Sequence, residues 1–119
     1  MAVKSFHDLY TWQKAMELVE EAYRLTQFFP KEETYGLRSQ VRRAAVSIPS
    51  NIAEGQGRDS TKEFQHFLAI ARGSLYEVIT QLLIAQRLKY ITEEQLQPAN
   101  GLTDEVGKLI NGLINSLKS

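Results

Sequence analysis

The chain has 119 residues, of which 43% are hydrophobic and none is cysteine, and its 14 basic and 14 acidic residues cancel to a net charge of zero. The lack of cysteine excludes disulfides, iron–sulfur clusters and thiolate zinc sites. The zero net charge excludes a long-range attraction of the whole protein for polyanions such as nucleic acids. This length is typical of one domain, so we expect a single domain over residues 1–119.

The first ten residues, MAVKSFHDLY, lack the apolar segment of a signal peptide. No window contains the roughly 18 uninterrupted apolar residues that a membrane-spanning helix requires. The absence of cysteine is compatible with a reducing compartment. We therefore expect a cytoplasmic protein without a membrane partner.

Apolar residues recur at helical spacing in four segments, and no strand-like alternation competes with them. The first predicted helix begins near Asp8 and runs toward Phe28. A following proline ends it, because the residue before a proline disfavours helical backbone angles. The predicted apolar stripe consists of Leu9, Trp12, Met16, Val19 and Tyr23, with Ala15, Ala22 and Thr26 beside it.

The second predicted helix begins between Lys31 and Thr34 and ends at Gly55 or Gly57, since a glycine in the left-handed conformation closes a helix at little steric cost. Pro49 has no N–H to donate to the carbonyl four residues earlier, so we expect a bend there. The predicted core face consists of Leu37, Val41, Ala44, Ala45, Ile48 and Ile52.

The third predicted helix opens with a capping box, in which Ser60 accepts a hydrogen bond from the Glu63 amide and Glu63 reaches back to the Ser60 amide. The helix ends near Lys89. Its predicted apolar stripe consists of Phe64, Phe67, Leu68, Ala71, Leu75, Val78, Ile79, Leu82 and Ala85.

The fourth predicted helix begins at a second capping box, Thr92 to Gln95. We expect Pro98 and the Asn-Gly pair at 100–101 to kink this helix or to split off its first turn. Its predicted apolar stripe consists of Leu102, Val106, Leu109, Ile110, Leu113 and Leu117.

Connections of about three to seven residues make consecutive helices run antiparallel. The sequence therefore predicts an all-α fold, an up-down-up-down antiparallel four-helix bundle. Interior glycines at Gly73, Gly107 and Gly112 each cost about 1 kcal/mol relative to alanine, and close approach of helices is the explanation we favour. Tolerance on an exposed face is the alternative for the last two.

The segment from Glu63 to His66 has the Glu-x-x-His spacing of di-iron sites in helical bundles. Such a site needs a second copy of this motif and two further glutamates, but the only other histidine, His7, precedes the first predicted helix. We interpret Glu63 as a capping residue and His66 as a surface or packing residue. No serine is accompanied by a histidine and an orienting carboxylate in a recognisable arrangement. We expect no catalytic residue, metal or cofactor.

Arg38, Arg42 and Arg43 lie in a stretch without acidic residues, and Arg58 follows it. These arginines are candidates for contacts with phosphates, in which case affinity falls with salt. We favour the alternative of a solvated face or of ion pairs within or between subunits, because the net charge is zero and no aromatic stacking motif accompanies the arginines. The candidate partners are Glu20, Glu21, Glu32, Glu54 and Glu77.

The run GLRSQVRRAAVSIPSNIAEGQGR from Gly36 to Arg58, with LAIARGS at 68–74, resembles the bacterial four-helix-bundle proteins encoded in 23S rRNA intervening sequences. The resemblance covers nearly the whole chain and implies a homopentamer without known enzymatic activity. That family is similar in fold to the accessory variability proteins of diversity-generating retroelements, which assist a reverse transcriptase and have a basic surface suited to nucleic acid. The residues that this likeness implies for such a surface are Arg38, Arg42, Arg43 and Arg58.

Two hypotheses about function follow. The first is a non-enzymatic, homo-oligomeric bundle that acts as a scaffold or adaptor, with itself as the main partner. The second is an accessory factor that binds RNA or DNA through the arginine-rich flank of the second predicted helix.

Overall fold

The computed structural model describes residues 5–118, and within this range the chain forms four α-helices, two short 3-10 helices and no strand. This confirms the predicted all-α fold with four helices. The α-helices are α1 (Tyr10–Thr26), α2 (Leu37–Gln56), α3 (Thr61–Arg87) and α4 (Glu93–Ser116). The 3-10 helices are η1 (Phe6–Asp8), before α1, and η2 (Lys31–Glu33), between α1 and α2.

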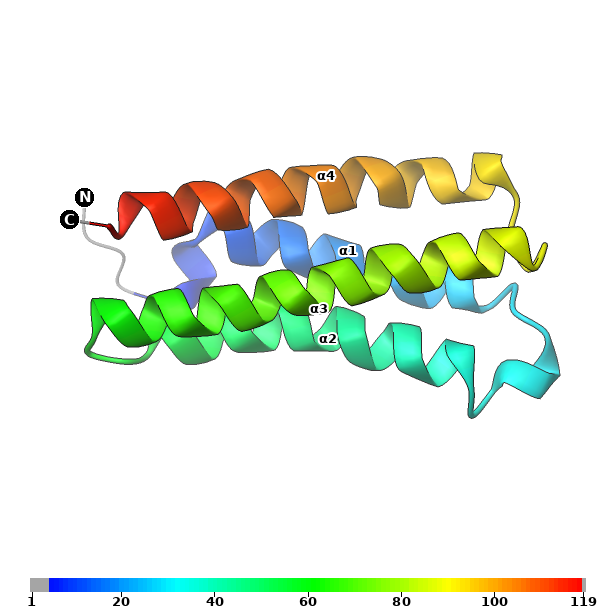
Figure 1. Ribbon diagram of the computed structural model, residues 1–119, viewed down its shortest axis with the longest axis horizontal. Coiled ribbons are helices and arrows are strands. Elements are labelled where there is room, and N and C mark those ends of the chain that lie inside the picture. Colours follow the sequence, from blue (N-terminus) through cyan, green and yellow to red (C-terminus); the bar gives the residue numbers. More distant parts are fainter. Residues whose placement is uncertain (1–4, 119) are drawn as a thin grey trace.

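The four α-helices lie along the long axis of a molecule that measures 45 × 25 × 20 Å (Figure 1). The turn between α2 and α3 lies at the end of the molecule that also holds η1 and the end of α4, on the left in Figure 1. The connections that contain η2 and the α3–α4 turn lie at the opposite end. Both α1 and α3 contact α2 and α4, so the four helices enclose one core.

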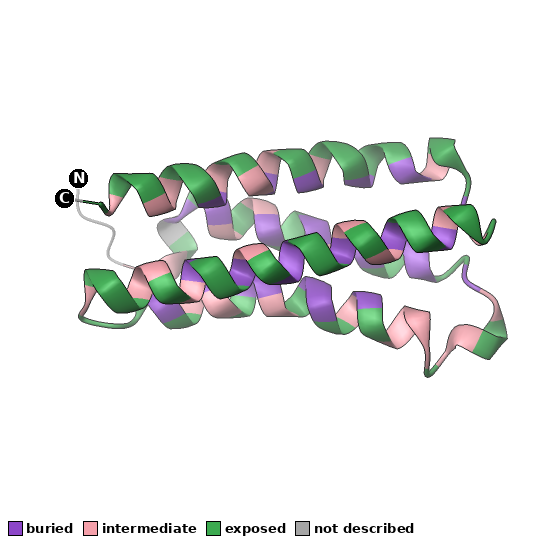
Figure 2. Cartoon of the chain, in the orientation of Figure 1, coloured by how far each residue is buried: buried purple, intermediate pink, exposed green. Residues whose placement is uncertain are grey.

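The core is built from the inward faces of all four helices, which appear purple in Figure 2. The predicted faces of α2 and α3 are confirmed in their central positions, where apolar residues recur every three or four positions and lie buried. Burying each such side chain contributes roughly 1.5–3 kcal/mol. The largest fully buried side chains are Leu18, Leu25, Val41, Ile48, Ile52, Leu68, Leu75, Val78, Leu82, Leu96, Val106 and Ile110.

The predicted apolar face of α1 is confirmed in part, because Leu9 is buried, Trp12 and Val19 pack against the core, and the predicted flanking residues Ala15, Ala22 and Thr26 are fully buried. Its centre, however, was wrongly placed. Met16 and Tyr23, which we placed in the core, have 40% and 41% of their surface exposed. The residues of α1 that are buried are Thr11, Ala15, Leu18, Ala22, Leu25 and Thr26. Short side chains such as alanine allow α1 to pack closely on its neighbours, and the larger apolar residues are left at the edge of the core. The size of the apolar side chains therefore misplaced the centre of the predicted face.

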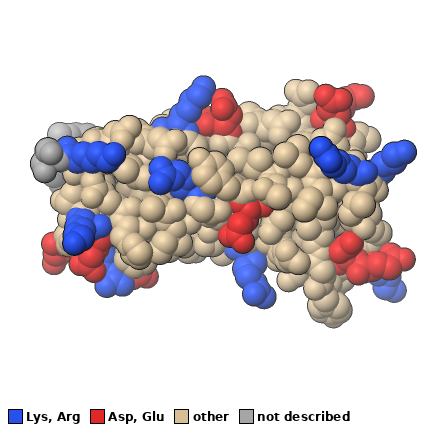
Figure 3. Space-filling model, in the orientation of Figure 1, with Lys and Arg blue, Asp and Glu red and all other residues tan. Residues whose placement is uncertain are grey.

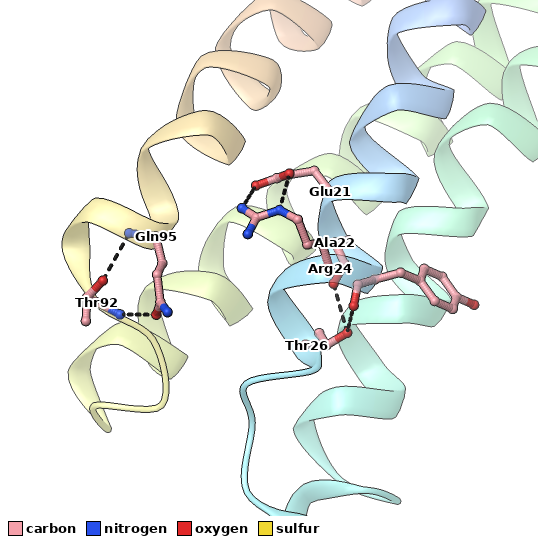
Figure 4. A network of polar contacts seen from close by, with 7 residues as sticks. Glu21, Ala22, Arg24, Thr26, Thr92 and Gln95 are labelled. Carbon is pink, nitrogen blue, oxygen red and sulfur yellow. Dashed lines mark hydrogen bonds and ion pairs between the residues drawn. The ribbon is translucent and has the colours of Figure 1, made fainter.

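The two predicted capping boxes have different outcomes. At the start of α4 the box is complete: Gln95 N donates to Thr92 Oγ1 at 3.0 Å, and Thr92 N donates to Gln95 Oε1 at 2.9 Å (Figure 4). At the start of α3 only half of it forms. Glu63 N donates to Ser60 Oγ at 3.2 Å, but the Glu63 carboxylate lies 3.6 Å from Arg58 and forms an ion pair with it. The Glu63 carboxylate thus pairs with Arg58 instead of accepting a hydrogen bond from the Ser60 amide.

Of the two alternatives for Pro98 and the Asn-Gly pair at 100–101, a split of the first turn was wrong, because α4 is continuous from Glu93 to Ser116. A kink there stays a prediction. Pro98 is exposed, so water can satisfy the carbonyl that lacks its helical donor. Leu96 and Ala99, on either side, are buried and hold both parts of the helix in the core. Pro49 likewise lies inside a continuous helix, and the bend expected there stays a prediction.

The end of α2 is where we expected it, but its conformation differs. Gly57 follows the last residue of α2 with a φ of −75°, so the left-handed glycine was wrong. Gly55 serves instead to bring two helices together. A Cβ atom on Gly55 would lie 2.7 Å from Phe67 Cβ and 3.0 Å from Phe64 Cδ1, both on α3. Only glycine lets α2 lie this near to α3.

Close approach was the wrong explanation for two of the three glycines to which we applied it. A Cβ atom on Gly73 or on Gly112 would have no neighbouring atom within 4 Å. On Gly107 it would lie 3.4 Å from Leu75 Cδ2, which is a contact between α4 and α3. Tolerance on an exposed face therefore fits Gly112, as the alternative proposed.

One helix, α3, is long and apolar enough to cross a membrane by length and composition alone. This is weak evidence, because the central helix of a bundle passes the same test, and the inward face of α3 is part of the core. The absence of a membrane partner stays a prediction.

We expect Gly55→Ala to destabilise the protein by about 1–3 kcal/mol, because the added methyl group overpacks the contact with Phe67. Gly73→Ala is the matched control and should stabilise the protein by up to about 1 kcal/mol, since alanine favours the helix and meets nothing. Urea denaturation followed by circular dichroism measures both. Equal effects of the two substitutions would show that the contact between α2 and α3 does not require glycine.

Candidate nucleic-acid interface

Of the four candidate arginines, only Arg58 forms ion pairs with carboxylates among the described residues. Arg58, in the α2–α3 turn, forms ion pairs with Glu54 at 2.7 Å and with Glu63 at 3.6 Å. Its guanidinium also lies over the Phe67 ring, 5.0 Å from the centroid. Two carboxylates therefore neutralise Arg58 where it stands.

Arg38 and Arg42 are held by neutral groups. Arg38 Nη2 donates to the Phe29 carbonyl at 2.7 Å, and Arg42 Nε donates to Thr26 Oγ1 at 2.8 Å. Thr26 Oγ1 in turn donates to the Ala22 carbonyl at 2.8 Å (Figure 4), so the same hydroxyl accepts from Arg42 and donates to the α1 backbone. These bonds position the guanidinium groups without cancelling their charge. Within residues 5–118, neither of these arginines nor Arg43 forms an ion pair with a carboxylate.

The three uncompensated arginines line one pocket between α1 and the first half of α2, with a volume of about 500 Å³. We call it the arginine pocket. Its lining residues are Tyr23, Thr34, Tyr35, Arg38, Ser39, Arg42, Arg43 and Val46. No acidic residue is among them, so their charges add to a local positive field although the protein is neutral overall. Figure 3 shows the usual mixture of the two signs on the face that it presents.

Two tyrosines line the pocket with these arginines, although the sequence showed no aromatic stacking motif beside them. The Arg42 guanidinium lies 4.4 Å from the centroid of the Tyr23 ring. Tyr35 is 96% exposed, which leaves both faces of its ring free. Cations beside exposed aromatic rings are typical of surfaces that bind single-stranded nucleic acid.

A carboxylate that the sequence did not single out positions the start of α2. Glu33 accepts hydrogen bonds from the Leu37 amide and the Tyr90 hydroxyl, each at 2.8 Å. The bond from Leu37 first, and that from Tyr90 second, lower the pKa of Glu33. A Cβ atom on Gly36 would lie 2.5 Å from Glu33 Oε1, so glycine makes room for the carboxylate. Glu33 thereby fixes the backbone on both sides of Tyr35.

A second hollow lies on the other side of α2, facing α3, with a volume of about 450 Å³. We call it the polar cleft. Its lining residues are Tyr35, Ser39, Gln40, Arg43, Ala44, Ser47, Ser74, Glu77 and Gln81. At its base the hydroxyl oxygens of Ser47 and Ser74 are 2.8 Å apart, and Asn51 Nδ2 donates to Ser47 Oγ at 2.9 Å. Tyr35, Ser39 and Arg43 line both hollows, so the two adjoin.

Glu63 and His66, which have the spacing of a di-iron motif, contact Arg58 and Phe67. Glu63 forms the ion pair with Arg58, and His66 is exposed with its ring 5.7 Å from that of Phe67. In the part of the chain that the structure describes, no three His, Asp or Glu side chains are grouped so that they could hold a metal ion. The interpretation of His66 as a surface or packing residue agrees with its position.

Comparison with known proteins gives a family and several similar solved structures. The family model for the 23S rRNA-intervening sequence protein matches residues 7–112. One of the similar solved structures is a protein of unknown function from the S23 ribosomal protein family of Bacteroides thetaiotaomicron, with a TM-score of 0.80 and 28% identity. The similarity covers 87% of this chain and 97% of that one. No curated protein matches the sequence.

We expect Glu33 to make stability depend on pH. Its pKa in the folded protein lies below the ordinary value of about 4.3, so its contribution is complete above that value and is lost as the pH falls through the folded pKa. Glu33→Gln should therefore lower Tm near neutral pH, and the difference from the wild type should shrink as the pH falls below the ordinary carboxyl pKa of about 4.3. Thermal denaturation across this range measures it. The neighbouring Glu32→Gln is the control, and a Tm difference that does not vary with pH would contradict the expectation.

Proposed function

Because the chain belongs to the 23S rRNA-intervening sequence protein family, we propose that it is a non-enzymatic accessory protein that binds single-stranded RNA through the arginine pocket. The observation that carries this proposal is the composition of that pocket, which has three arginines, two tyrosines and no carboxylate. Arginines contact phosphates and tyrosines stack on unpaired bases. Arg38, Arg42 and Arg43 take part, whereas Arg58 is neutralised by its glutamates and does not.

The charge distribution supports binding by contact rather than by long-range attraction. The whole protein has no net charge, and a local field extends over about one Debye length, which is about 8 Å at physiological ionic strength. The Arg38 and Arg42 side chains are already held by hydrogen bonds, so binding costs little of their conformational entropy. An RNA strand that enters the pocket therefore meets cations in fixed positions.

A second proposal is that the protein is a homo-oligomer, a pentamer by its family resemblance, and acts as a cytoplasmic scaffold or adaptor. Its unit is an up-down-up-down antiparallel bundle, which is supported by connections that lie at alternate ends of the molecule. An apolar groove between α1 and α2, of about 350 Å³, supports the self-association. It is lined by Trp12, Met16, Val19, Val46, Pro49, Ser50 and Ala53. Exposed apolar surface of this kind is typical of contacts between proteins.

Arg43→Gln tests the RNA proposal without disturbing a contact within the chain. We expect weaker binding of a fluorescein-labelled nonauridine in fluorescence anisotropy. The slope of log affinity against log salt concentration should become shallower by about 0.7, the value for one lost phosphate contact on a single strand. Arg58→Gln and Arg87→Gln are controls, and neither should change the slope. Unchanged binding by Arg43→Gln, or no binding by the wild type at low salt, would contradict the proposal.

Light scattering coupled to size-exclusion chromatography tests the oligomer. We expect the wild type at micromolar concentration to exceed the monomer mass of 13.5 kDa. Met16→Lys should reduce the mass to that of the monomer, because a charge in the apolar groove would be buried in the interface. Leu88→Lys, at an exposed apolar site outside the groove, is the control. A monomeric wild type would remove this proposal.

A further inference from the structure

We propose that the polar cleft between α2 and α3 binds an unpaired guanine base of the RNA whose phosphates occupy the arginine pocket. This inference rests on the proposed function, since the arginine pocket supplies the contacts with the strand. The two hollows adjoin at Tyr35, Ser39 and Arg43. One nucleotide can therefore place its phosphate in the first hollow and its base in the second. A volume of about 450 Å³ lies within the range of small-molecule sites.

The walls of the polar cleft hold hydrogen-bonding groups that the described chain does not use. Arg43 on α2 and Glu77 on α3 line the same cleft, yet among residues 5–118 no ion pair joins them. Gln81 Oε1 is buried and accepts no hydrogen bond within this range. The cleft thus offers the Glu77 carboxylate and the amide oxygens of Gln40 and Gln81 as acceptors, and the Arg43 guanidinium as a donor.

The polar side chains at the base of the cleft form hydrogen bonds with one another and not with Arg43, Glu77 or Gln81. Ser47 and Ser74 are hydrogen-bonded to each other, and Asn51 donates to the Ser47 hydroxyl and to the Ser47 carbonyl. These side chains satisfy one another and form a fixed polar floor. Arg43, Glu77 and Gln81 above it remain for a ligand.

Guanine presents the complementary set of groups. Its N1–H and N2 amino group are adjacent donors, which one carboxylate accepts together, and this assigns the Watson–Crick edge to Glu77. Its O6 and N7 are adjacent acceptors, to which an arginine donates in pairs. This assigns the other edge to Arg43 when guanine is bound, and leaves the phosphate of that nucleotide to Arg38 and Arg42. The second N2 hydrogen is left for Gln81 Oε1. The exposed ring of Tyr35 at the mouth of the cleft provides a stacking surface.

The carboxylate is the group that selects guanine. Adenine and cytosine each present a ring nitrogen acceptor beside their amino group, and uracil presents two carbonyl oxygens beside its single N–H. Each of these bases would place an acceptor lone pair against the Glu77 carboxylate, so the two acceptors would repel and the carboxylate would lose a hydrogen-bond donor. One good bidentate contact discriminates by about tenfold or more.

The test uses labelled nonauridines with guanine, adenine or inosine at the central position, each measured by fluorescence anisotropy. We expect the guanine strand to bind about tenfold more tightly than the adenine strand and the unsubstituted strand. Inosine, which lacks the N2 amino group, should bind with intermediate affinity. Glu77→Gln should remove the preference for guanine, and Glu94→Gln, an exposed acid on α4, should retain it. Glu77 is exposed, and circular dichroism verifies that the variant is folded.

The outcomes separate the two proposals. Equal affinity for all strands, with the salt dependence retained, would overturn the guanine site and leave the arginine pocket as the binding surface. If no strand binds, the proposed function fails. Titration with guanosine 5′-monophosphate followed by NMR then tests whether the polar cleft binds guanine independently of an RNA strand. Saturable shifts in the wild type that Glu77→Gln abolishes would support the guanine site, and their absence would overturn it.

Discussion

The contact of α2 with α3 at Gly55 is the constraint on which the other features depend. Because Gly55 has no side chain, the α2 backbone meets Phe67 and Phe64 directly, and the two helices are fixed at one end of the molecule. Farther along both helices the Ser47–Ser74 hydrogen bond replaces this apolar contact. Figure 1 shows α2 diverging from α3 toward its start, and the polar cleft opens on that side. The two helices are thus in close contact at Gly55 and are separated by the polar cleft toward the start of α2.

The arginine pocket depends on a different principle, the separation of hydrogen bonding from charge neutralisation. A carboxylate partner would have held Arg42 and cancelled its charge, as Glu54 does for Arg58. The Thr26 hydroxyl holds Arg42 equally well and leaves the charge available. A neutral protein can in this way present a positive pocket, and counting charges along the chain does not reveal it.

The sequence predicts the features that depend on local spacing. The inward faces of α2 and α3 follow from helical periodicity, and the Thr92–Gln95 box follows from residues three positions apart. Features that depend on competition between partners or on packing with other helices could not be predicted. The Ser60 box is incomplete because Glu63 pairs with Arg58, and the buried face of α1 is set by its contacts with α2 and α4.

The aromatic groups of the candidate site were missed for the same reason. Tyr23 comes from another helix, and the backbone beside Tyr35 is held by a hydrogen bond between residues 33 and 90. In retrospect, a glutamate three residues before Gly36 was the available local signal, because a carboxylate there can reach the first amide of α2 past a residue without a side chain.

The connection that contains η2 and the segment beside Tyr35 lie at the end of the molecule opposite η1 and the end of α4 (Figure 1). Along an axis of 45 Å, both hollows therefore lie away from η1 and from the last turn of α4. An affinity tag, a fluorophore or a link to a sensor surface that is placed beside η1 or beside the last turn of α4 would leave both hollows uncovered. A crystallisation partner fused there would likewise leave both hollows open to soaked ligands.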